Sequence, residues 1–348
     1  MAAHRPLLLA AVSALVLLAI AACSGDDDAA PNGGPTVVPP DAFILYRDTS
    51  ASIIARNLAT EDLFEYPADL ETGAVVATAC SPDGSRLALL KQPFDIVNRQ
   101  LLVTGRDAPA EPITLPSAVQ GIGWSPSGTH VVYTEFDGLA NEYSISVLDV
   151  ATAQSTALAS GEGVAGSPSW SPDGSHLAYS VQDVLATESH VYLLEPVEGG
   201  TPARQSLGED LLYYDPEWAP NGRTILVAGQ SVTDTQLYQF DAKSGNPEQF
   251  TSSNVYKRRP RYAPDGKTIA YTGSVIPETV SRTVTVLHQF GIFLLDADGG
   301  NERALTADPR LNPGADIDPD LDAFLMGWCL PGPWLDDSWT EVVETTAP

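Results

Sequence analysis

Short stretches of alternating apolar and polar residues recur along most of this chain, and each follows a similar turn. After the turn, every second position is apolar, and this period of two predicts a β-strand. The apolar pairs that share a face are Leu87 and Leu89, Val131 and Tyr133, Leu177 and Tyr179, Ile225 and Val227, and Ile269 and Tyr271. The pattern therefore predicts a series of equivalent hairpin strands.

The turns carry the chemistry that a tight hairpin needs. Proline presets φ at the first turn position, and glycine supplies the positive φ that closes the hairpin. The copies read CSPDG from Cys80, WSPSG from Trp124, WSPDG from Trp170, WAPNG from Trp218 and YAPDG from Tyr262. Their prolines are 44, 46, 48 and 44 residues apart. A period in the forties with several strands per unit is typical of propeller blades.

Each unit contains further strand signals, so that four strands form a blade. Apolar runs that end in Asp, Gly or Asn begin at Tyr143, His190, Gln236 and Gly291, and short outer strands are predicted over Ser155–Leu158, Glu248–Thr251 and Arg303–Thr306. We therefore predict an all-β fold, a β-propeller of four-stranded blades, with six blades and a seven-bladed ring as the alternative.

The two ends of the repeat region are expected to close the ring together. Between Asp41 and Glu65 the sequence has three strands without a preceding SPDG strand. Near the C-terminus, the segment from Asp316 to Trp328 aligns as a worn copy, with Ile317 at the aromatic position and Leu321 in place of the glycine. We expect this C-terminal strand to pair with the N-terminal strands and complete the first blade. The run that ends at Trp328 then supplies one strand more than the blade needs.

The repeats resemble the WD40-like propeller repeats of TolB-type proteins, in which DxDGGNxxxLT and PxWSPDG recur from blade to blade. Asp296–Asn301 with Leu305 and Thr306 carry the first motif, and Pro168–Gly174 carry the second. The resemblance covers roughly Asp41 to Leu330 and implies a propeller that docks partner proteins at one face. Only a short segment precedes the repeats here, so we expect no counterpart of the separate N-terminal α/β domain of TolB-type proteins. Fold alone does not fix function.

The N-terminus is predicted to be a lipoprotein signal. An apolar run over residues 6–22 follows His4 and Arg5. The run is short and ends in small residues, as expected before a signal-peptide cleavage point and not in a membrane-spanning helix. The sequence Ile20-Ala21-Ala22-Cys23 resembles the bacterial lipobox, and the resemblance implies acylation of Cys23. An ordinary signal peptide with a chance cysteine is the alternative. The expected organisation is a signal peptide over 1–22, a tether over 23–40, the propeller over 41–335 and a loose acidic tail over 336–348.

Composition narrows the classes of partner. The chain has a formal net charge of −27, which disfavours nucleic acid as a partner because like charges repel. Export predicts a place on the outer face of the cell membrane or in the periplasm, with the membrane reached through Cys23 and the propeller monomeric. Cys80 and Cys329 can form a disulfide in such a compartment, and buried free thiols are the alternative.

Catalytic signatures are missing from the sequence. It has no GxSxG, HExxH, CxxC or phosphate-binding glycine loop, and we predict no catalytic residue, metal or cofactor. His130 and His176 occupy equivalent positions after two turns, which indicates a repeated surface position. Asp316, Asp318, Asp320 and Asp322 superficially resemble a calcium loop but lack its glycine and its final glutamate.

A basic and aromatic cluster near the start of two innermost strands is the candidate docking site. Its residues are Tyr213, Tyr214 and Asp215 in one blade, and Tyr256, Lys257, Arg258 and Arg259 in the next. Since innermost strands surround the central channel, we expect this channel mouth to bind an acidic peptide or an envelope protein. Pairing of the arginines with neighbouring acids is the alternative. The competing function is a propeller enzyme, a lyase or hydrolase of saccharides or peptides, with its site at the channel.

Overall fold

The computed structural model describes residues 42–47, 52–66, 73–93, 98–105, 107–109, 111–116, 119–183, 188–196, 203–208, 211–231, 234–253, 255–275, 291–305, 324–330, 332–333, 335 and 339–341. The predicted signal peptide, Cys23 and the tether lie outside these residues, as do the four aspartates from Asp316 to Asp322. The described part contains no helix with the length and hydropathy that a membrane crossing requires.

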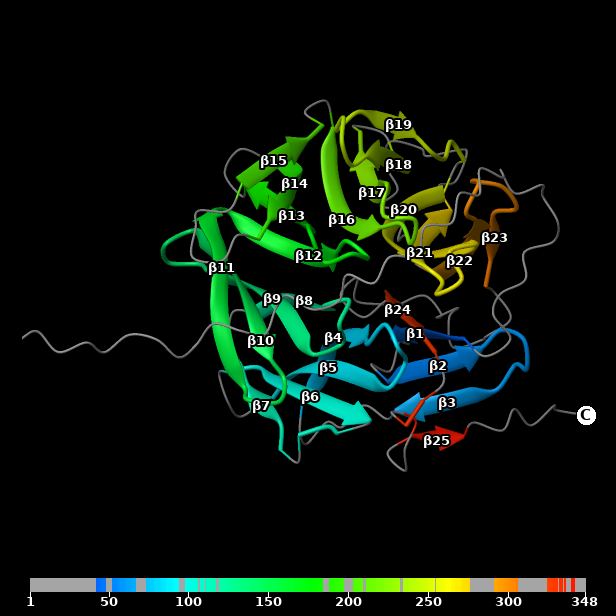
Figure 1. Cartoon of the computed structure of the whole chain (residues 1–348). Helices are drawn as coiled ribbons and strands as arrows, with labels where there is room; N and C mark the ends of the chain where they lie inside the picture. Colours follow the sequence, from blue (N-terminus) through cyan, green and yellow to red (C-terminus); the bar gives the residue numbers. More distant parts are fainter. Residues whose placement is uncertain are drawn as a thin grey trace, which may run out of the picture. The chain divides into compact units, whose positions relative to one another are not determined.

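The described strands form six antiparallel sheets arranged as the blades of a propeller, which confirms the predicted fold class (Figure 1). From the innermost strand outward, blades 2 to 4 are β4–β7 (Ala74–Cys80, Arg86–Gln92, Gln100–Gly105, Ile113–Thr114), β8–β11 (Val119–Trp124, His130–Asp137, Glu142–Asp149, Gln154–Glu162) and β12–β15 (Val164–Trp170, Leu177–Asp183, Glu188–Glu195, Ala203–Leu207). Blades 5 and 6 are β16–β19 (Leu212–Trp218, Thr224–Gln230, Thr235–Asp241, Pro247–Gln249) and β20–β23 (Val255–Tyr262, Thr268–Val275, Gly291–Asp296, Arg303–Ala304).

Blade 1 is assembled from both ends of the propeller, as predicted. Its strand order is β24 (Phe324–Cys329), β1 (Phe43–Arg47), β2 (Ile53–Asn57), β3 (Leu63–Tyr66) and β25 (Thr340–Glu341). The innermost strand β24 pairs antiparallel with β1, so the red C-terminal strand lies beside the blue N-terminal one (Figure 1). The fifth strand corrects the expectation of a loose tail from Asp336, because β25 pairs with β3 and Trp339 beside it is buried.

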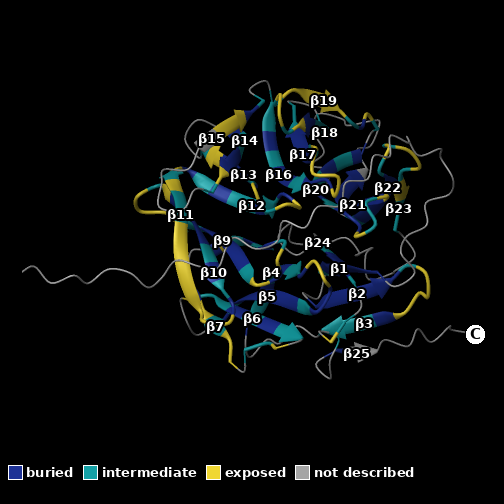
Figure 2. Ribbon diagram, viewed as in Figure 1, coloured by how far each residue is buried: buried dark blue, intermediate teal, exposed yellow. Residues whose placement is uncertain are grey.

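Six clusters of buried apolar side chains hold the ring together, and each fills the space between two adjacent blades. In β5, Leu87 and Leu89 pack against blade 1, whereas Ala88 and Leu90 pack against blade 3. Alternate residues of one strand therefore serve two different interfaces, and the middle strands are buried on both faces (Figure 2). Each innermost strand also contacts the innermost strands on either side, from β24 around to β20.

The hairpin turns lie next to one another around the ring. Their glycines have φ between 66° and 73°, which confirms the predicted turn chemistry. A side chain added at Gly128, Gly174, Gly222 or Gly266 would lie within 4 Å of the turn proline of the preceding blade. At Gly84 the corresponding neighbour is Leu330.

This neighbour corrects the position of the sixth turn copy. Leu330 takes the proline position, so Trp328, Cys329 and Leu330 align with Trp124, Ser125 and Pro126. The indole nitrogens agree, because Trp124 Nε1 donates to Ala79 O at 2.8 Å and Trp328 Nε1 donates to Arg261 O at 3.2 Å, each time one residue before the aromatic position of the preceding blade. The proposed worn copy at Ile317 is therefore wrong, and β24 is the innermost strand itself, with no strand in excess.

Cys80 and Cys329 form a disulfide in this structure, with Cα atoms 5.5 Å apart and a sequence separation of 249. Cys80 ends β4 in blade 2, and Cys329 ends β24 in blade 1. The bond therefore joins the innermost strand of blade 2 to β24, the C-terminal strand that closes blade 1.

We predict that this disulfide stabilises the ring closure. Replacing both cysteines with alanine should lower the free energy of unfolding by roughly 2–5 kcal/mol, because the bond constrains a long loop in the unfolded chain. Urea unfolding of the double variant and the parent protein measures the difference. In a Cys23→Ser background only these two cysteines remain. Thiol titration of the unreduced, unfolded protein should then find no free thiol, and two reactive thiols would contradict the bond.

Candidate functional site

Three neighbouring innermost strands share an unusual bulge. Ser167, Asp215 and Arg259 each precede a proline and adopt positive φ of 48°, 52° and 52°. The register against the next strand shifts at the same place in β12, β16 and β20. Proline has no N–H to give to the ladder, and a non-glycine residue at positive φ costs about 1–2 kcal/mol. The strand is thereby bent so that polar side chains reach across blade boundaries.

Asp215 connects three blades through its carboxylate. Its Oδ1 accepts from Ser167 Oγ at 2.9 Å, and its Oδ2 accepts from Arg258 Nε at 2.8 Å and from the Arg259 backbone N–H at 3.1 Å. Burial by itself would raise the pKa of this carboxyl. The guanidinium groups of Arg258, Arg259 and Arg261 outweigh burial and hold the pKa of Asp215 well below its usual range.

Glu217 repeats the arrangement two residues further along β16. Its Oε2 accepts from Ser169 Oγ at 3.3 Å and lies 3.6 Å from Arg261 Nη1. Burial dominates and raises the pKa of Glu217, although the nearby Arg261 charge lowers it. We call Ser167, Ser169, Asp215, Glu217, Arg258, Arg259 and Arg261 the axial ladder. Blades 4, 5 and 6 contribute serines, acids and arginines to it, respectively.

The axial ladder is confined to half of the ring. The residues immediately before the aromatic position are Ser169, Glu217 and Arg261 in blades 4 to 6, and Gly327, Ala79 and Gly123 in blades 1 to 3. Small residues allow the close approach of blades 3 and 4, where a side chain at Gly123 would lie 2.7 Å from Pro168 O. The polar and charged side chains are therefore collected on one side of the axis.

Several of the predicted docking residues belong to this half and remain partly exposed. The Arg258 guanidinium lies 4.4 Å from the centre of the Tyr214 ring, and the Arg258 side chain is 31% exposed. Tyr214, Tyr256 and Arg259 are also only partly buried. The alternative expectation, that the arginines pair with neighbouring acids, also holds in part, because Arg258 pairs with Asp215. Glu217 and Arg261 stand beside the predicted docking residues in the sequence but were not assigned to the site, although their 48- and 44-residue spacing from Ser169 and Glu217 was visible.

Tyr213 and Lys257 do not face the axis, which corrects their assignment to the docking site. Tyr213 is fully buried and packs against Tyr238 and Phe240 in the core between blades 4 and 5. Lys257 is also fully buried. Neighbouring residues of a strand point to opposite faces, so Tyr213 cannot share a face with Tyr214, nor Lys257 with Arg258.

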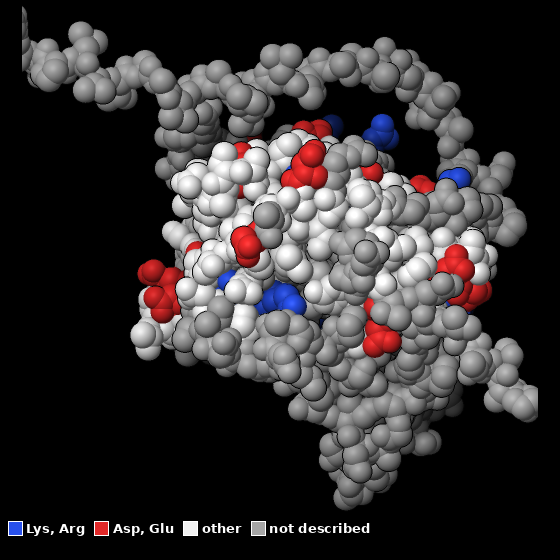
Figure 3. Space-filling model, turned by 90° about the horizontal axis from the view of Figure 1, so that it is seen from below, with Lys and Arg blue, Asp and Glu red and all other residues white. Residues whose placement is uncertain are grey.

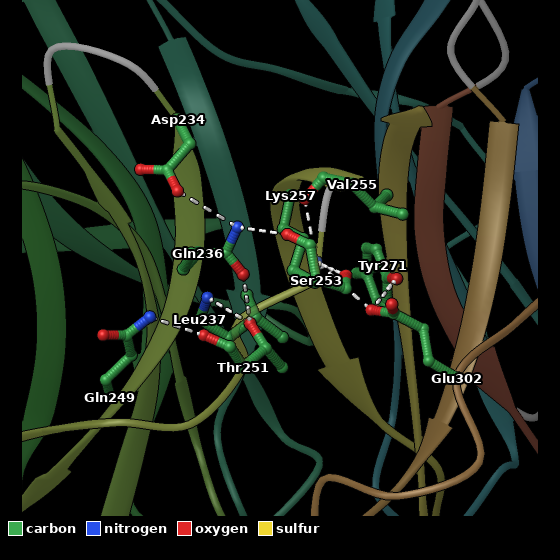
Figure 4. A network of polar contacts seen from close by, with 10 residues as sticks. All are labelled: Asp234, Gln236, Leu237, Gln249, Thr251, Ser253, Val255, Lys257, Tyr271 and Glu302. Carbon is green, nitrogen blue, oxygen red and sulfur yellow. Dashed lines mark hydrogen bonds and ion pairs between the residues drawn. The ribbon is translucent and has the colours of Figure 1, made fainter. Parts of the chain in front are cut away.

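Lys257 instead belongs to a polar network between blades 5 and 6 (Figure 4). Its Nζ donates to Ser253 Oγ at 2.7 Å and to Val255 O at 2.8 Å, and lies 3.2 Å from Glu302. The Tyr271 hydroxyl donates to Glu302 Oε1 at 2.5 Å. Burial lowers the pKa of Lys257, whereas the hydrogen bonds from Ser253, Tyr271 and Lys257 overcome burial and lower the pKa of Glu302.

The network continues into blade 5 through amide side chains. Gln236 Nε2 donates to Ser253 O at 2.8 Å, and Thr251 Oγ1 donates to Gln236 Oε1 at 2.9 Å (Figure 4). The buried charges of Lys257 and Glu302 are thus paired and hydrogen-bonded, as burial requires. We assign this cluster to the contact between blades 5 and 6 rather than to a binding site.

Charged side chains outside the ladder form no comparable site in the described residues. None of their His, Cys, Asp and Glu side chains gather in groups of three that would suit a metal ion. His130 Nε2 lies 3.7 Å from Asp149 and His190 Nε2 lies 3.5 Å from Glu188, both near the surface. On the face shown in Figure 3, acidic side chains are scattered and the basic ones form only small groups.

The family model of the TolB β-propeller domain matches residues 110–307, which is more than half of the chain. The chain belongs to the TolB β-propeller family. Among curated proteins, no sequence match was found. The TolB-type repeats inferred from the sequence are thereby confirmed, and the matched range includes the whole axial ladder.

Solved structures similar to this TolB-family propeller show the same fold. TolB from Acinetobacter baumannii superposes with a TM-score of 0.62 at 13% identity, over 84% of this chain and 68% of that one. A TolB candidate from Agrobacterium tumefaciens gives 0.52 at 17% identity, over 76% and 88%. Oligogalacturonate lyase from Vibrio parahaemolyticus gives 0.52 at 13% identity, over 76% and 79%. At these identities the likeness establishes the fold and not the activity.

We predict that Asp215 links the stability of this TolB-family propeller to pH. Asp215→Asn should cost roughly 3 kcal/mol at pH 7, because it leaves a buried arginine contact uncompensated. The folded pKa of Asp215 lies below its ordinary value of 3.8, so its stabilisation is complete above that value and is lost as the pH falls below it. The difference in the free energy of unfolding between the variant and the parent protein should therefore be about 1 kcal/mol smaller at pH 3 than at pH 7.

Urea unfolding at pH 7 and pH 3 measures both quantities. Glu248→Gln, which changes an exposed acid in β19, is the control. It should change neither the free energy of unfolding at pH 7 nor its dependence on pH. A cost for Asp215→Asn that is the same at both pH values would contradict the role of the ionised carboxylate.

Proposed function

We propose that this protein is an exported, lipid-anchored propeller that binds a partner in the cell envelope at the axial ladder. The observation that carries the proposal is the partly exposed set of Tyr214, Tyr256 and Arg258 beside Asp215, in one half of the ring of a strongly acidic chain. Arg258 uses Nε for Asp215 and also hydrogen-bonds Tyr256, and a guanidinium has five N–H donors. An acidic peptide or a carboxylate of the partner can bind the remaining donors without breaking the internal pair.

The anchor is proposed from the sequence, since Cys23 lies outside the described residues. Several acyl chains on one residue hold a protein at a membrane far more firmly than one chain does. The tether over 23–40 is rich in Asp, Gly and Pro, a composition that favours a flexible link. It would let the propeller reach a partner above the membrane surface.

We predict that Cys23→Ser moves the protein from the membrane to the soluble fraction. The change removes the sulfur that would carry the lipid and leaves the propeller sequence intact. Fractionation of cells that express either form, followed by detection of the protein, measures the distribution. Glu248→Gln, which changes an exposed residue of the propeller and leaves the disulfide intact, serves as the control. If the Cys23→Ser protein still sediments with membranes, the proposed anchor is wrong.

We predict that Arg258→Gln combined with Arg259→Gln lowers partner recovery by about tenfold, which corresponds to 1.4 kcal/mol. Glutamine removes the charge that would attract an acidic partner. Because it also removes the cations from beside Asp215, partner recovery is compared at a temperature at which both proteins are folded. Cross-linking and pulldown from native membranes compare the variant with the parent protein. Arg223→Gln combined with Lys243→Gln removes two exposed basic residues of blade 5 and is the matched control. Equal recovery in all three proteins, with unchanged thermal unfolding, would reject the ladder as the docking site.

A second candidate, an enzyme acting at the same place, is favoured by one observation. Asp215 and Glu217 have pKa values shifted in opposite directions, and such pairs occur at acid and base sites. Ion pairs also shift pKa values in purely structural clusters, and both carboxylates are paired with arginines here. Turnover of a saccharide or peptide that Glu217→Gln abolishes, with partner recovery unaffected by the arginine variant, would favour the enzyme.

A further inference from the structure

The outer edge of blade 3 differs from the other outer edges of the ring. Its outermost strand, β11, has nine residues, whereas β7, β15, β19 and β23 have two, five, three and two. The sequence predicted only the short strand Ser155–Leu158, so most of this length was missed. Figure 2 shows β11 as a long exposed strand at the rim.

The usual protections of an edge strand are missing from the first part of β11. Short length, lysine, proline and bulges all discourage pairing with another chain. Gln154–Ala157 contains no proline and no charged residue, and all four residues are exposed. A bulge opposite Ile145 and Ser146 interrupts the strand only after Ala157. No other strand in the described part of the chain pairs with the outer side of β11.

The same protein provides an example of what such an edge can accept. In blade 1, β25 adds to β3 as a fifth strand, antiparallel, through Thr340 and Glu341. Backbone N–H and C=O groups supply this kind of pairing, so it does not depend on a particular side-chain sequence. The edge of blade 3 is longer and presents its backbone in the same outermost position.

The charge around this edge indicates the kind of strand that would bind. From residue 107 to residue 203 the sequence has no Lys or Arg and 12 Asp or Glu. This range includes all of blade 3. Asp149 lies opposite Gln154 at the start of β11, and Glu142 and Glu162 lie opposite each other at its far end, where a strand that extended beyond Ala157 would reach them. A second copy of this chain would bring another acidic surface to the same place, which is unfavourable. A basic segment would be attracted.

We propose that Gln154–Ala157 is a docking edge for an extended basic segment of another polypeptide, which adds to blade 3 as a fifth strand. The site is independent of Cys23 and of the axial ladder. Main-chain hydrogen bonds would provide the affinity, and lysine or arginine residues flanking the paired segment would provide selectivity through Glu142, Glu162 and the acidic surroundings.

The test uses two synthetic peptides and the full-length propeller without its anchor, as Cys23→Ser protein. Both peptides alternate valine and threonine. One carries two lysines at each end, and the other carries glutamates at the same positions. The lysine peptide should bind at least about tenfold more tightly than the glutamate peptide, and it should slow hydrogen exchange of the amides in β11. Absence of binding, or protection of β16 and β20 instead, overturns the proposal.

Proline variants test the backbone edge itself. Consecutive residues of a strand direct their N–H groups to opposite sides. Of Ser155→Pro and Thr156→Pro, one therefore removes an N–H that points outward and leaves the pairing with β10 intact, and the other removes an N–H that bonds to β10. The variant that keeps the parent unfolding midpoint should lose lysine-peptide binding by tenfold or more. Unchanged binding by that variant overturns the proposal.

Charge variants and controls complete the experiment. Glu142→Gln combined with Glu162→Gln should weaken lysine-peptide binding without affecting the fold, because both acids are exposed. Arg258→Gln combined with Arg259→Gln should leave peptide binding unchanged, which separates this edge from the axial ladder. If the protein alone forms a dimer at increasing concentration with β11 protected, a second copy covers the edge and the proposal is wrong.

Discussion

Packing between neighbouring blades is the constraint on which the whole structure depends. A single blade has apolar side chains on both faces, as Leu87 and Leu89 on one side of β5 and Ala88 and Leu90 on the other show. No blade can bury both faces by itself, so every blade needs two neighbours. A ring satisfies this requirement without leaving an end blade exposed. Blade 1 then has to join the chain ends, which it does by pairing β24 with β1, and the disulfide ties β24 to blade 2.

This constraint leaves only a few positions of each repeat at which the proposed binding sites can lie. Contacts between blades constrain the residues of the turn, of the aromatic position and of the apolar pairs. The residue before the aromatic position is less restricted and varies from Gly123 to Ser169, Glu217 and Arg261. The outer strands are also less restricted, because they contact only one strand of their own blade. The axial ladder and the β11 edge therefore use the two places that the repeat leaves open.

The sequence predicted the hairpins, the number of blades and the closure of the ring because these depend on turn chemistry and on a period of two. It placed the sixth copy wrongly because Cys329 and Leu330 replace the usual serine and proline, and only the spatial neighbour Gly84 reveals the register. The docking cluster was partly wrong because composition drew Lys257 into a group with Arg258, whereas strand alternation separates them. The length of β11 was missed because an edge exposed on both faces has no apolar period.

The internal pairing of the axial ladder also limits what can bind there. Asp215 accepts hydrogen bonds from blades 4 and 6 at once, so removing it would disturb the spacing of three blades. A ligand that competed for all of the Arg258 donors would have to leave a buried carboxylate without its cation, which is strongly unfavourable. A ligand that uses only the outward donors of Arg258 and the face of Tyr256 avoids this cost. For the proposed partner, this favours a carboxylate that contacts the exposed part of Arg258 over one that inserts between blades 5 and 6, where Lys257 and Glu302 are already paired.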